Sequence, residues 1–334
     1  MAAHAGPPWA VAVSGGGDSL ALMHLLHDFA RARGLAAPLV LTVDHGLRKS
    51  SARDARQVAA WAKQAGLVVH ALTWRGKKPK SGIEAQAREA RYRLMGDFLT
   101  ANKIATLFVG HNLDDQVETF LLRLARGSGL DGLAGMAPRA PWPVPGFAGL
   151  ALARPLLGFS RDQLRAYLLN AGQAWLDDPM NDDASFDRVK IRKVRAALTK
   201  AGLTPVRIAA AASHLARARE SLEIMTEAVL QRAARKTDTG GILLDTAALA
   251  AAPREVGLRG LASVLMLVGG EPYRPRFESL ERLFDRITGT GLAGGATLHG
   301  CHLRPAGKVL APFSLVVVPE KPRKTGSSTK FPAR

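Results

Sequence analysis

The chain has 334 residues and a formal net charge of +18, from 46 Lys and Arg against 28 Asp and Glu. This length predicts two or three domains, and 47% apolar with 22% charged residues is typical of a folded globular protein. The single cysteine, Cys301, excludes an intrachain disulfide framework, cysteine-rich zinc modules and cysteine-ligated iron–sulfur clusters in this chain. The positive surplus predicts a polyanionic partner, either nucleic acid or an anionic membrane surface, although a generally basic proteome would produce the same surplus.

Nothing in the sequence indicates a membrane segment. No apolar run reaches the ~18 residues that a membrane helix needs. Residues 1–9 lack the basic start of a secretory signal and lead directly into an apolar run. We therefore expect a cytoplasmic protein with no membrane partner.

The first half of the chain alternates short apolar runs with amphipathic helical stretches, which predicts an α/β fold whose parallel sheet is covered by helices on both faces. The expected strands are Ala10–Val13, Leu39–Val43, Leu67–Leu72 and Thr106–Val109, and the expected helices are 19–33, 52–65, 84–99 and 114–125. Ligands of open parallel sheets bind outside the carboxyl ends of the strands. The polar segments 14–19, 44–48 and 110–118 follow three of these strands, so we expect them to converge on one edge.

The second half is less regular. We expect a loop over 127–158, helices at about 160–171, 186–201 and 205–235, further helix within 253–287, and a β-hairpin from 296–304 and 308–318. This pattern divides the chain into a catalytic domain (1–205), a smaller α+β domain that binds the polyanion (206–319) and a disordered basic tail (320–334).

The sharpest motif follows the first strand, where six residues lead into a helix: Ser14, Gly15, Gly16, Gly17, Asp18 and Ser19. Glycines let the backbone approach an anion, and a helix start offers free N–H groups, so this segment predicts a phosphate cradle. Asp18 fits there if Mg²⁺ bridges it to the phosphates. The alternative is a glycine-rich turn in which Asp18 or Ser19 caps the helix. The chain has no Walker A sequence, which excludes that class of ATPase.

Two further segments carry candidate site residues. Asp44 and His45 follow the second strand, where an acidic residue can reach a ribose or adenine, although a simple polar turn would look the same. His111, Asp114 and Asp115 follow the fourth strand and open a helix. The two carboxylates can be read as helix-capping residues, but a histidine beside them favours a metal, pyrophosphate or acid–base site.

Three other patterns are weaker. Glu84, Arg88 and Arg91 share one helical face, which is usually a surface of ion pairs, although one arginine can instead face the triphosphate or RNA. The Gly-x-Gly-x-x-Gly match at 127–132 follows a helical pattern, not a strand, so it does not predict a dinucleotide site. His299 and His302 flank Cys301, and we expect them to be strand residues, not zinc ligands.

The loop Ser14–Ser19 resembles the SGGxDS loop of the ATP-pyrophosphatases. The ordered set SGGGDS, VDHGLR, ARxxRY, GHNLDDQVET and ARGSGLDGLAGM resembles the tRNA(Ile)-lysidine synthetases, as do Arg154–Leu157, 178–181 and 188–192. Val189 departs from the Asn that is usual in this family. The resemblance covers about residues 10–200 and is only loose beyond 205.

The resemblance implies a Rossmann-like, adenine nucleotide alpha hydrolase-like fold. It also implies a ligase that joins L-lysine to carbon 2 of the wobble cytidine of the CAU-anticodon isoleucine tRNA, with ATP and Mg²⁺. The implied catalytic residues are Asp18, Asp44, Arg91, His111 and Asp115. The implied ATP-binding residues are Ser14, Gly15, Gly16, Gly17, Asp18, Ser19, Asp44, His45 and Arg126, and the implied metal ligands are Asp18, Asp114 and Asp115.

Three alternatives stay open at this point. Ammonia-using synthetases share the phosphate loop but have no need of the +18 charge. The tRNA thiolation enzymes need cysteine pairs, which one cysteine does not supply. A basic tRNA-binding protein without activity has no need of intact Asp18, Asp114 and Asp115.

Overall fold

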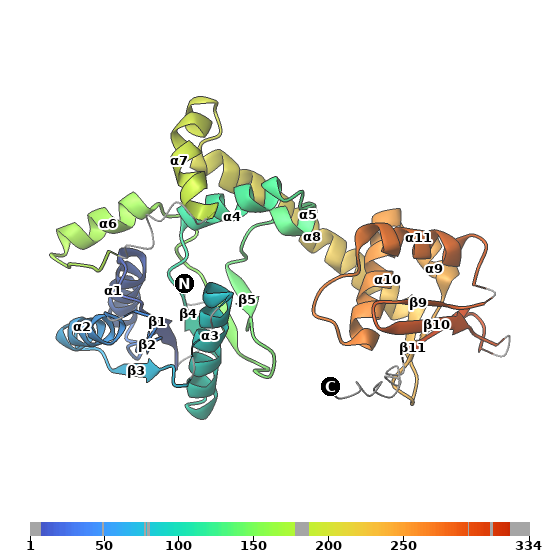
Figure 1. The fold of residues 1–334 in the computed structure, drawn as a ribbon, viewed down its shortest axis with the longest axis horizontal. Coiled ribbons are helices and arrows are strands. Elements are labelled where there is room, and N and C mark those ends of the chain that lie inside the picture. The colour runs from blue at the N-terminus through green and yellow to red at the C-terminus, as the bar shows by residue number, and fades with distance from the viewer. Residues whose placement is uncertain are drawn as a thin grey trace, which may run out of the picture. The chain divides into compact units, whose positions relative to one another are not determined.

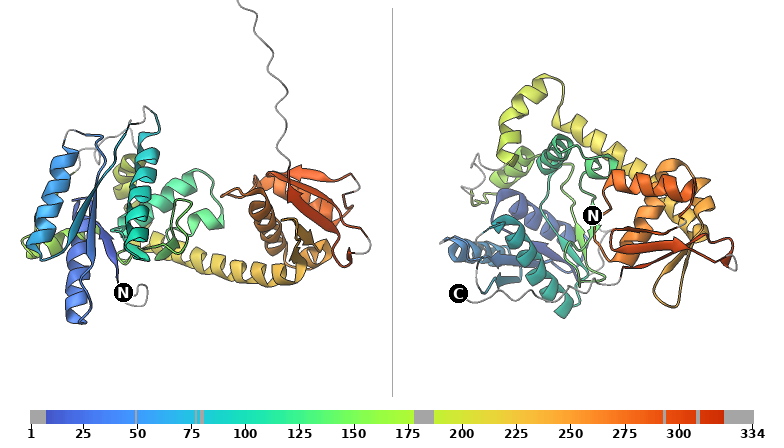
Figure 2. Two further views of the ribbon diagram at one scale, coloured as in Figure 1. Left: turned by 90° about the horizontal axis from the view of Figure 1, so that it is seen from below. Right: turned by 45° about the vertical axis from the view of Figure 1, so that its right-hand side comes forward.

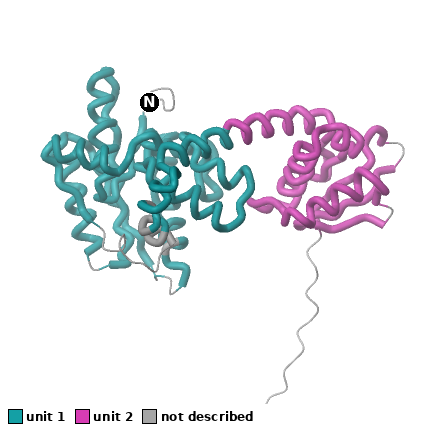
Figure 3. The backbone as a smooth tube through the Cα atoms, turned by 90° about the horizontal axis from the view of Figure 1, so that it is seen from above, with its two compact units in different colours: residues 1–216 teal, residues 217–334 magenta. Residues whose placement is uncertain are grey.

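The computed structural model describes residues 8–48, 50–76, 78, 81–177, 187–292, 294–307 and 310–320. The chain divides into two compact units, unit 1 (residues 1–216) and unit 2 (residues 217–334), as the colours of Figure 3 show. The division falls inside helix α8 (Pro205–Ala233), whose start coincides with the expected boundary near 205. The domain limits given above stay predictions, and residues 321–334 of the expected tail lie outside the described residues.

Unit 1 is built on a six-stranded sheet with the order β3-β2-β1-β4-β6-β5 (Figure 1). All neighbouring pairs are parallel except β5–β6, which is antiparallel at the edge. The strands are β1 (Ala10–Ala12), β2 (Leu39–Asp44), β3 (Val69–Thr73), β4 (Thr106–Phe108), β5 (Arg139–Pro141) and β6 (Ala151–Ala153). The chain order reverses direction across the sheet between β1 and β4, which is the switch point where open α/β sheets bind ligands.

Helices cover both faces of this sheet, as predicted (Figures 1 and 2). On one face, Val11 and Val40 pack with α1 (Gly17–Ala32), α2 (Ser51–Gln64) and α6 (Arg161–Asn170). On the other, Ala10 and Leu41 pack with α3 (Ile83–Ala101). Adjacent residues of one strand therefore belong to different cores, which explains why these strands are apolar throughout and show no alternation.

The expected loop over 127–158 is wrong in part. It contains α5 (Leu130–Leu133) and the strands β5 and β6, which extend the sheet beyond β4. Both strands are three residues long and lie among Gly and Pro residues, so neither has a readable period. Unit 1 is completed by α4 (Leu113–Ala125) and α7 (Asp187–Lys200).

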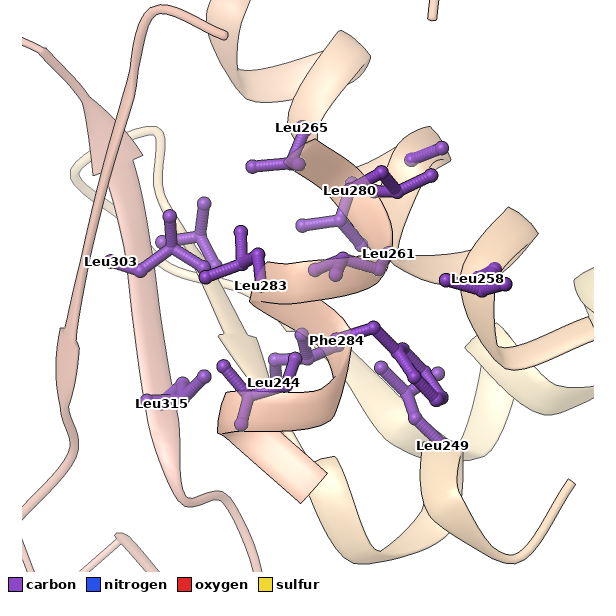
Figure 4. Close-up of a cluster of buried hydrophobic side chains, with 14 of the residues drawn as sticks. Leu244, Leu249, Leu258, Leu261, Leu265, Leu280, Leu283, Phe284, Leu303 and Leu315 are labelled. Atoms are coloured by element: carbon purple, nitrogen blue, oxygen red, sulfur yellow. The ribbon is translucent and has the colours of Figure 1, made fainter. Parts of the chain in front are cut away.

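Unit 2 is an antiparallel sheet of order β7-β8-β11-β10-β9 that packs on helices. Its strands are β7 (Ala234–Lys236), β8 (Ile242–Leu244), β9 (Ala296–Leu298), β10 (Cys301–Pro305) and β11 (Leu315–Pro319), and its helices are α9 (Thr246–Ala250), α10 (Arg254–Gly269) and α11 (Phe277–Thr288). Figure 4 shows leucines of α10 and α11 facing Leu244, Leu303 and Leu315 of the sheet around Phe284. The α+β class is therefore confirmed.

The expected pairing of 296–304 with 308–318 is confirmed by the antiparallel pair β10–β11, but residues 296–304 also form a tighter hairpin of their own. The tight hairpin joins β9 to β10 through His299 and Gly300, both with positive φ (56° and 71°), a conformation typical of two-residue hairpin turns. His302 is a strand residue as expected, but His299 is a turn residue. Within the described ranges, no helix is long and apolar enough to cross a membrane.

Candidate nucleotide site

The segment after β1 has the geometry of a phosphate cradle. α1 begins at Gly17 after Gly16, whose missing side chain leaves the helix start without a side-chain cap. The Ser19 hydroxyl donates to the carbonyl of Gly16 (2.9 Å) and accepts from the amide of Ser14 (3.2 Å). The first intrahelical bond runs from the amide of Ser19 to the carbonyl of Gly16 (3.1 Å), so the amides of Gly17 and Asp18 before it are the ones available to an anion.

Glycines permit two close approaches around this loop. Gly15 has φ +96°, and its carbonyl accepts from the amide of Leu176 (2.9 Å). A Cβ on Gly110, the first residue of the motif after β4, would lie 3.0 Å from the carbonyl oxygen of Asp18 and from the backbone of Ser19. The segments after β1 and β4 therefore touch, as their common sheet edge predicts.

The motif after β4 opens α4 with a capping box. The side chain of Asn112 accepts from the amide of Asp115 (3.0 Å), and the carboxylate of Asp115 accepts from the amide of Asn112 (3.1 Å). Asp114 is buried, and its Oδ2 accepts from the amide of Arg161 (2.7 Å). The capping interpretation of Asp115 is therefore correct. The capping bond uses only Oδ2, however, and Oδ1 lies near Arg161, which also contacts Asp18.

Arg161, the first residue of α6, joins the two motifs. Its Nε lies 3.3 Å from Oδ2 of Asp18, and its terminal nitrogen lies 3.6 Å from Oδ1 of Asp115. Burial raises the pKa of Asp115 to about 6 and also raises that of Asp18, while the Arg161 charge opposes both shifts. Arg161 does not reach the buried Oδ1 of Asp18, and the side-chain amide of Asn112 is the donor beside this carboxylate. The carboxylates of Asp18 and Asp115 thus lie beside the same guanidinium and are mostly buried.

His111 lies beside a buried arginine that the sequence reasoning did not assign to the site. Nε of Arg154 donates to Nδ1 of His111 (3.3 Å), and a terminal nitrogen of Arg154 donates to the carbonyl of Ala137 (2.9 Å). Arg154 follows β6, so it reaches the same sheet edge as the other motifs. The only sequence signal for Arg154 is that Arg154–Leu157 belongs to the set of segments that resemble the tRNA(Ile)-lysidine synthetases.

Asp44 and His45 follow β2 on the same edge, but both are engaged in their own turn. Oδ1 of Asp44 accepts from the hydroxyl of Ser51 (2.5 Å) and the amide of Gly46 (3.0 Å), and Nδ1 of His45 accepts from the amide of Leu47 (3.2 Å). These bonds fix the β2–α2 turn at the edge of the nucleotide site.

Two predicted residues are not brought to the phosphate loop. Arg126 is the C-cap of α4, and eleven residues at about 1.5 Å each separate it from Asp115 by about 17 Å along the helix. Arg91 lies on α3 with its guanidinium 5.6 Å from the centre of the Tyr92 ring; the residue as a whole is exposed, but burial lowers the pKa of its guanidinium, and its neighbour Arg88 also lies near Arg154. The segment 178–181 and the side chains of 188–190 and Arg192 lie outside the described part of the chain.

A small cavity lies behind the acidic motif. Its volume is about 10 Å³, room for about one water molecule. Asp114 and Glu118 line it together with apolar side chains of α4, α7, the α7–α8 connection and α8: Val117, Leu121, Ile191, Leu198, Leu203, Pro205 and Ile208.

This geometry bears on which of the three predicted ligands, Asp18, Asp114 and Asp115, can hold a metal ion. Among the described residues, no three His, Cys, Asp or Glu side chains are close enough to cage a metal ion. Mg²⁺ is usually held by one or two carboxylates together with substrate phosphates, and Asp18 and Asp115 beside the phosphate loop fit that arrangement. Asp114, which accepts from Arg161 and lines the cavity, stays a predicted ligand only.

Comparisons with known proteins agree with this site. The PP-loop domain family matches residues 3–198. A tRNA(Ile)-lysidine synthase of Ruegeria pomeroyi is 43% identical over 268 residues, which are 80% of this chain and 62% of that protein. One of Methylobacterium nodulans is 41% identical over 322 residues, covering 95% of this chain and 91% of that protein. The chain thus spans less than two thirds of the Ruegeria relative and nearly all of the Methylobacterium one.

A solved structure supports the fold. The U34-tRNA thiolase NcsA from Methanococcus maripaludis with its 4Fe-4S cluster superposes with a TM-score of 0.50 over 64% of this chain and 71% of that chain, at 16% identity. Likeness at this identity shows the shared architecture alone. The family model and the two relatives go further, and together they establish that the chain belongs to the tRNA(Ile)-lysidine synthase family and contains a PP-loop domain.

Proposed function

We propose that this protein ligates L-lysine to carbon 2 of the wobble cytidine, position 34, of the isoleucine tRNA that carries a CAU anticodon. ATP adenylates O2 of the cytidine and pyrophosphate leaves. The ε-amine of lysine then attacks carbon 2, and AMP departs with that oxygen. The observation that carries this proposal is the phosphate loop joined to the acidic motif at the switch point of a PP-loop sheet, in a chain of this family.

The ATP half of the reaction suits the segment Ser14–Ser19. Its backbone N–H groups and the positive end of α1 would hold the phosphates, and Gly15 and Gly110 keep the cradle open to them. Asp44 and His45 would border the nucleoside at the end of β2. Asp18 and Asp115 would hold Mg²⁺, which when bound offsets charge that develops on the departing pyrophosphate.

The lysine half needs a neutral amine, so a group at the site must accept a proton. Asp115, whose pKa burial raises to about 6, is one candidate for that role, in which case Asp18 is the carboxylate that holds the metal. His111, whose Nδ1 accepts from Arg154, and Asp44 are further candidates.

The RNA half is supported by the surface of unit 2. The connection from α10 to α11 exposes Tyr273 (66%) and Phe277 (59%) beside the exposed Arg274 and Arg276. Its backbone is held by His299, whose Nε2 lies 2.7 Å from the carbonyl oxygen of Tyr273. Aromatic rings stack on bases and arginines pair with phosphates, so this connection suits RNA. A tRNA substrate also favours the cytoplasm as the compartment.

The decisive experiment is ATP-dependent incorporation of radiolabelled lysine into an unmodified isoleucine tRNA transcript with a CAU anticodon. The methionine tRNA with the same anticodon is the control. Labelling of the isoleucine tRNA alone is the expected result. Absence of labelling, in a folded protein that releases pyrophosphate when offered ammonia, would reassign the protein to the ammonia-using synthetases.

The remaining alternatives have their own outcomes in the same assay. Sulfur incorporation into the transcript would indicate a thiolation enzyme, against which the single, buried Cys301 argues. Tight tRNA binding without pyrophosphate release from any acceptor would indicate a binding protein without activity.

A further inference from the structure

Arg161 occupies an unusual place in the candidate site. Its guanidinium lies 3.3 Å from Asp18 of α1 and 3.6 Å from Asp115 of α4, and its backbone amide donates to Asp114 (2.7 Å). One residue of α6 therefore meets carboxylates that reach the site from two different strand–helix junctions. Neither the phosphate loop nor the capping box of α4 requires this arginine, because each is closed by its own hydrogen bonds.

Partial burial strengthens the ion pairs that Arg161 makes with Asp18 and Asp115. The side chains of Arg161, Asp18 and Asp115 are 22%, 25% and 20% exposed, so solvent screens their charges only in part. Two carboxylates held together in such a place need a cation nearby. The guanidinium of Arg161 supplies that charge to Oδ2 of Asp18 and Oδ1 of Asp115, while the side-chain amide of Asn112 lies beside Asp18.

We propose that Arg161 is the internal counter-ion of the Asp18–Asp115 pair and competes with the divalent cation for it. The cation and the guanidinium need the same two carboxylates, so the metal binds weakly while Arg161 stays in place. Phosphates arriving at the loop offer the guanidinium another anionic partner and release the carboxylates to the metal. Arg161 is thus a positioning residue that makes metal binding depend on nucleotide binding. This inference rests on the proposed function only in taking that nucleotide to be ATP.

Direct metal binding tests the competition. Free Mn²⁺ is measured by electron paramagnetic resonance while it is titrated into the full-length protein without nucleotide. Arg161→Gln should bind Mn²⁺ at least about tenfold more tightly than the parent, since removal of a neighbouring positive charge favours a cation. Addition of a non-hydrolysable ATP analogue should bring the two affinities to within about threefold, because the parent's arginine is then displaced.

Matched variants separate competition from a general charge effect. Arg31→Gln removes the same charge from an exposed ion pair with Asp28 on α1 and should leave Mn²⁺ affinity at the parent's value. Adding Asp18→Asn to Arg161→Gln should abolish the gained affinity. If Arg161→Gln binds Mn²⁺ no more tightly than the parent, or if Arg31→Gln gains as much, the proposal is wrong.

A purely structural role for Arg161 makes a different prediction about stability. If Arg161 competes with the metal, Arg161→Gln should melt at a lower temperature than the parent in EDTA. Addition of Mn²⁺ should then raise the melting temperature of the variant by more than it raises that of the parent. Loss of stability that Mn²⁺ does not restore would indicate a purely structural role and overturn the proposal.

If the glutamine variant does not fold, Arg161→Lys serves instead. Lysine keeps the charge but cannot contact both carboxylates as a guanidinium does, so the Mn²⁺ affinity of this variant should lie between those expected for the parent and for Arg161→Gln. A Mn²⁺ affinity equal to the parent's would contradict the proposal. These measurements contain neither lysine nor tRNA, so their failure leaves the ligation assay independent.

Discussion

Gly110 is the residue at which the two motifs of the site come closest. A methyl group there would lie 3.0 Å from the backbone of Asp18 and Ser19, and backbone atoms cannot rotate away as a flexible side chain can. We expect Gly110→Ala to weaken ATP binding about tenfold or more and to destabilise the protein by about 1–3 kcal/mol through overpacking. ATP titration and urea denaturation measure the two effects.

Gly158→Ala is the matched control, because a Cβ at that position meets nothing within 4 Å. It should leave both quantities unchanged. Retention of full ATP affinity in Gly110→Ala would mean that the segment after β4 can withdraw from the phosphate loop at no cost to binding.

Cys301 offers a second measurement at the scale of one residue. Its side chain is fully buried, its thiol donates to the carbonyl of Leu265 (3.2 Å), and burial raises its pKa to about 11. A thiol whose pKa is higher in the folded than in the unfolded chain stabilises the fold below pH 9, and that contribution is lost as the pH rises from about 9 to 11. Urea denaturation at pH 8.5, 9.5 and 10.5 should show this decline in the parent and less of it in Cys301→Ala; equal declines would contradict the shift.

At the scale of an element, helix α10 depends on glycine for packing. A Cβ on Gly257 would lie 2.6 Å from the Phe284 ring of α11 and 2.8 Å from the carbonyl oxygen of Leu249 in α9. Alanine favours a helix over glycine by roughly 1 kcal/mol, but here the methyl group has no room. We therefore expect Gly257→Ala to destabilise unit 2 by about 1–3 kcal/mol in denaturation of the full chain. A stabilised variant would show that α10 and α11 can separate slightly without loss.

Elements also determine how far sequence reasoning reached. The loop Ser14–Ser19 and the pair Asp114–Asp115 were predictable because each is contiguous and follows an apolar strand. Arg154 was assigned no role because its strand, β6, is three residues long within a Gly- and Pro-rich stretch. Arg161 was missed because its contacts to Asp18 and Asp115 join residues distant in sequence. Arg126 was assigned to ATP by the family resemblance alone, and helix α4 separates it from Asp115 by about 17 Å.

At the scale of the whole molecule, the net charge of +18 predicts that the affinity for RNA falls as the salt concentration rises. Each phosphate contact by Lys or Arg adds about 0.7–0.9 to the slope of log affinity against log salt. Replacing Arg274 and Arg276 by Ala should lower that slope by roughly 1.4–1.8 for the isoleucine tRNA and leave ATP affinity unchanged. Fluorescence anisotropy of labelled tRNA at salt concentrations between about 50 and 200 mM measures this slope.

Arg254→Ala provides the control within the same unit. Arg254 lies at the start of α10 and pairs with Asp285 (2.6 Å) and Glu281 (3.3 Å) of α11, so its removal changes the net charge without altering the α10–α11 connection. Because this variant removes one charge and the other removes two, a change of slope half as large would indicate that the effect reflects net charge and not a contact at the α10–α11 connection.

The edge strand β5 has a consequence for how this protein behaves at high concentration. A strand at the edge of a sheet offers unpaired N–H and carbonyl groups, which another chain can extend into an aggregate. β5 ends at Pro141, and Pro143 and Pro145 follow it within four residues. Proline has no N–H to donate and its ring obstructs a neighbouring strand. The short β5 therefore serves as a terminator: it stops the growth of an otherwise apolar parallel sheet and protects the protein against aggregation at that edge.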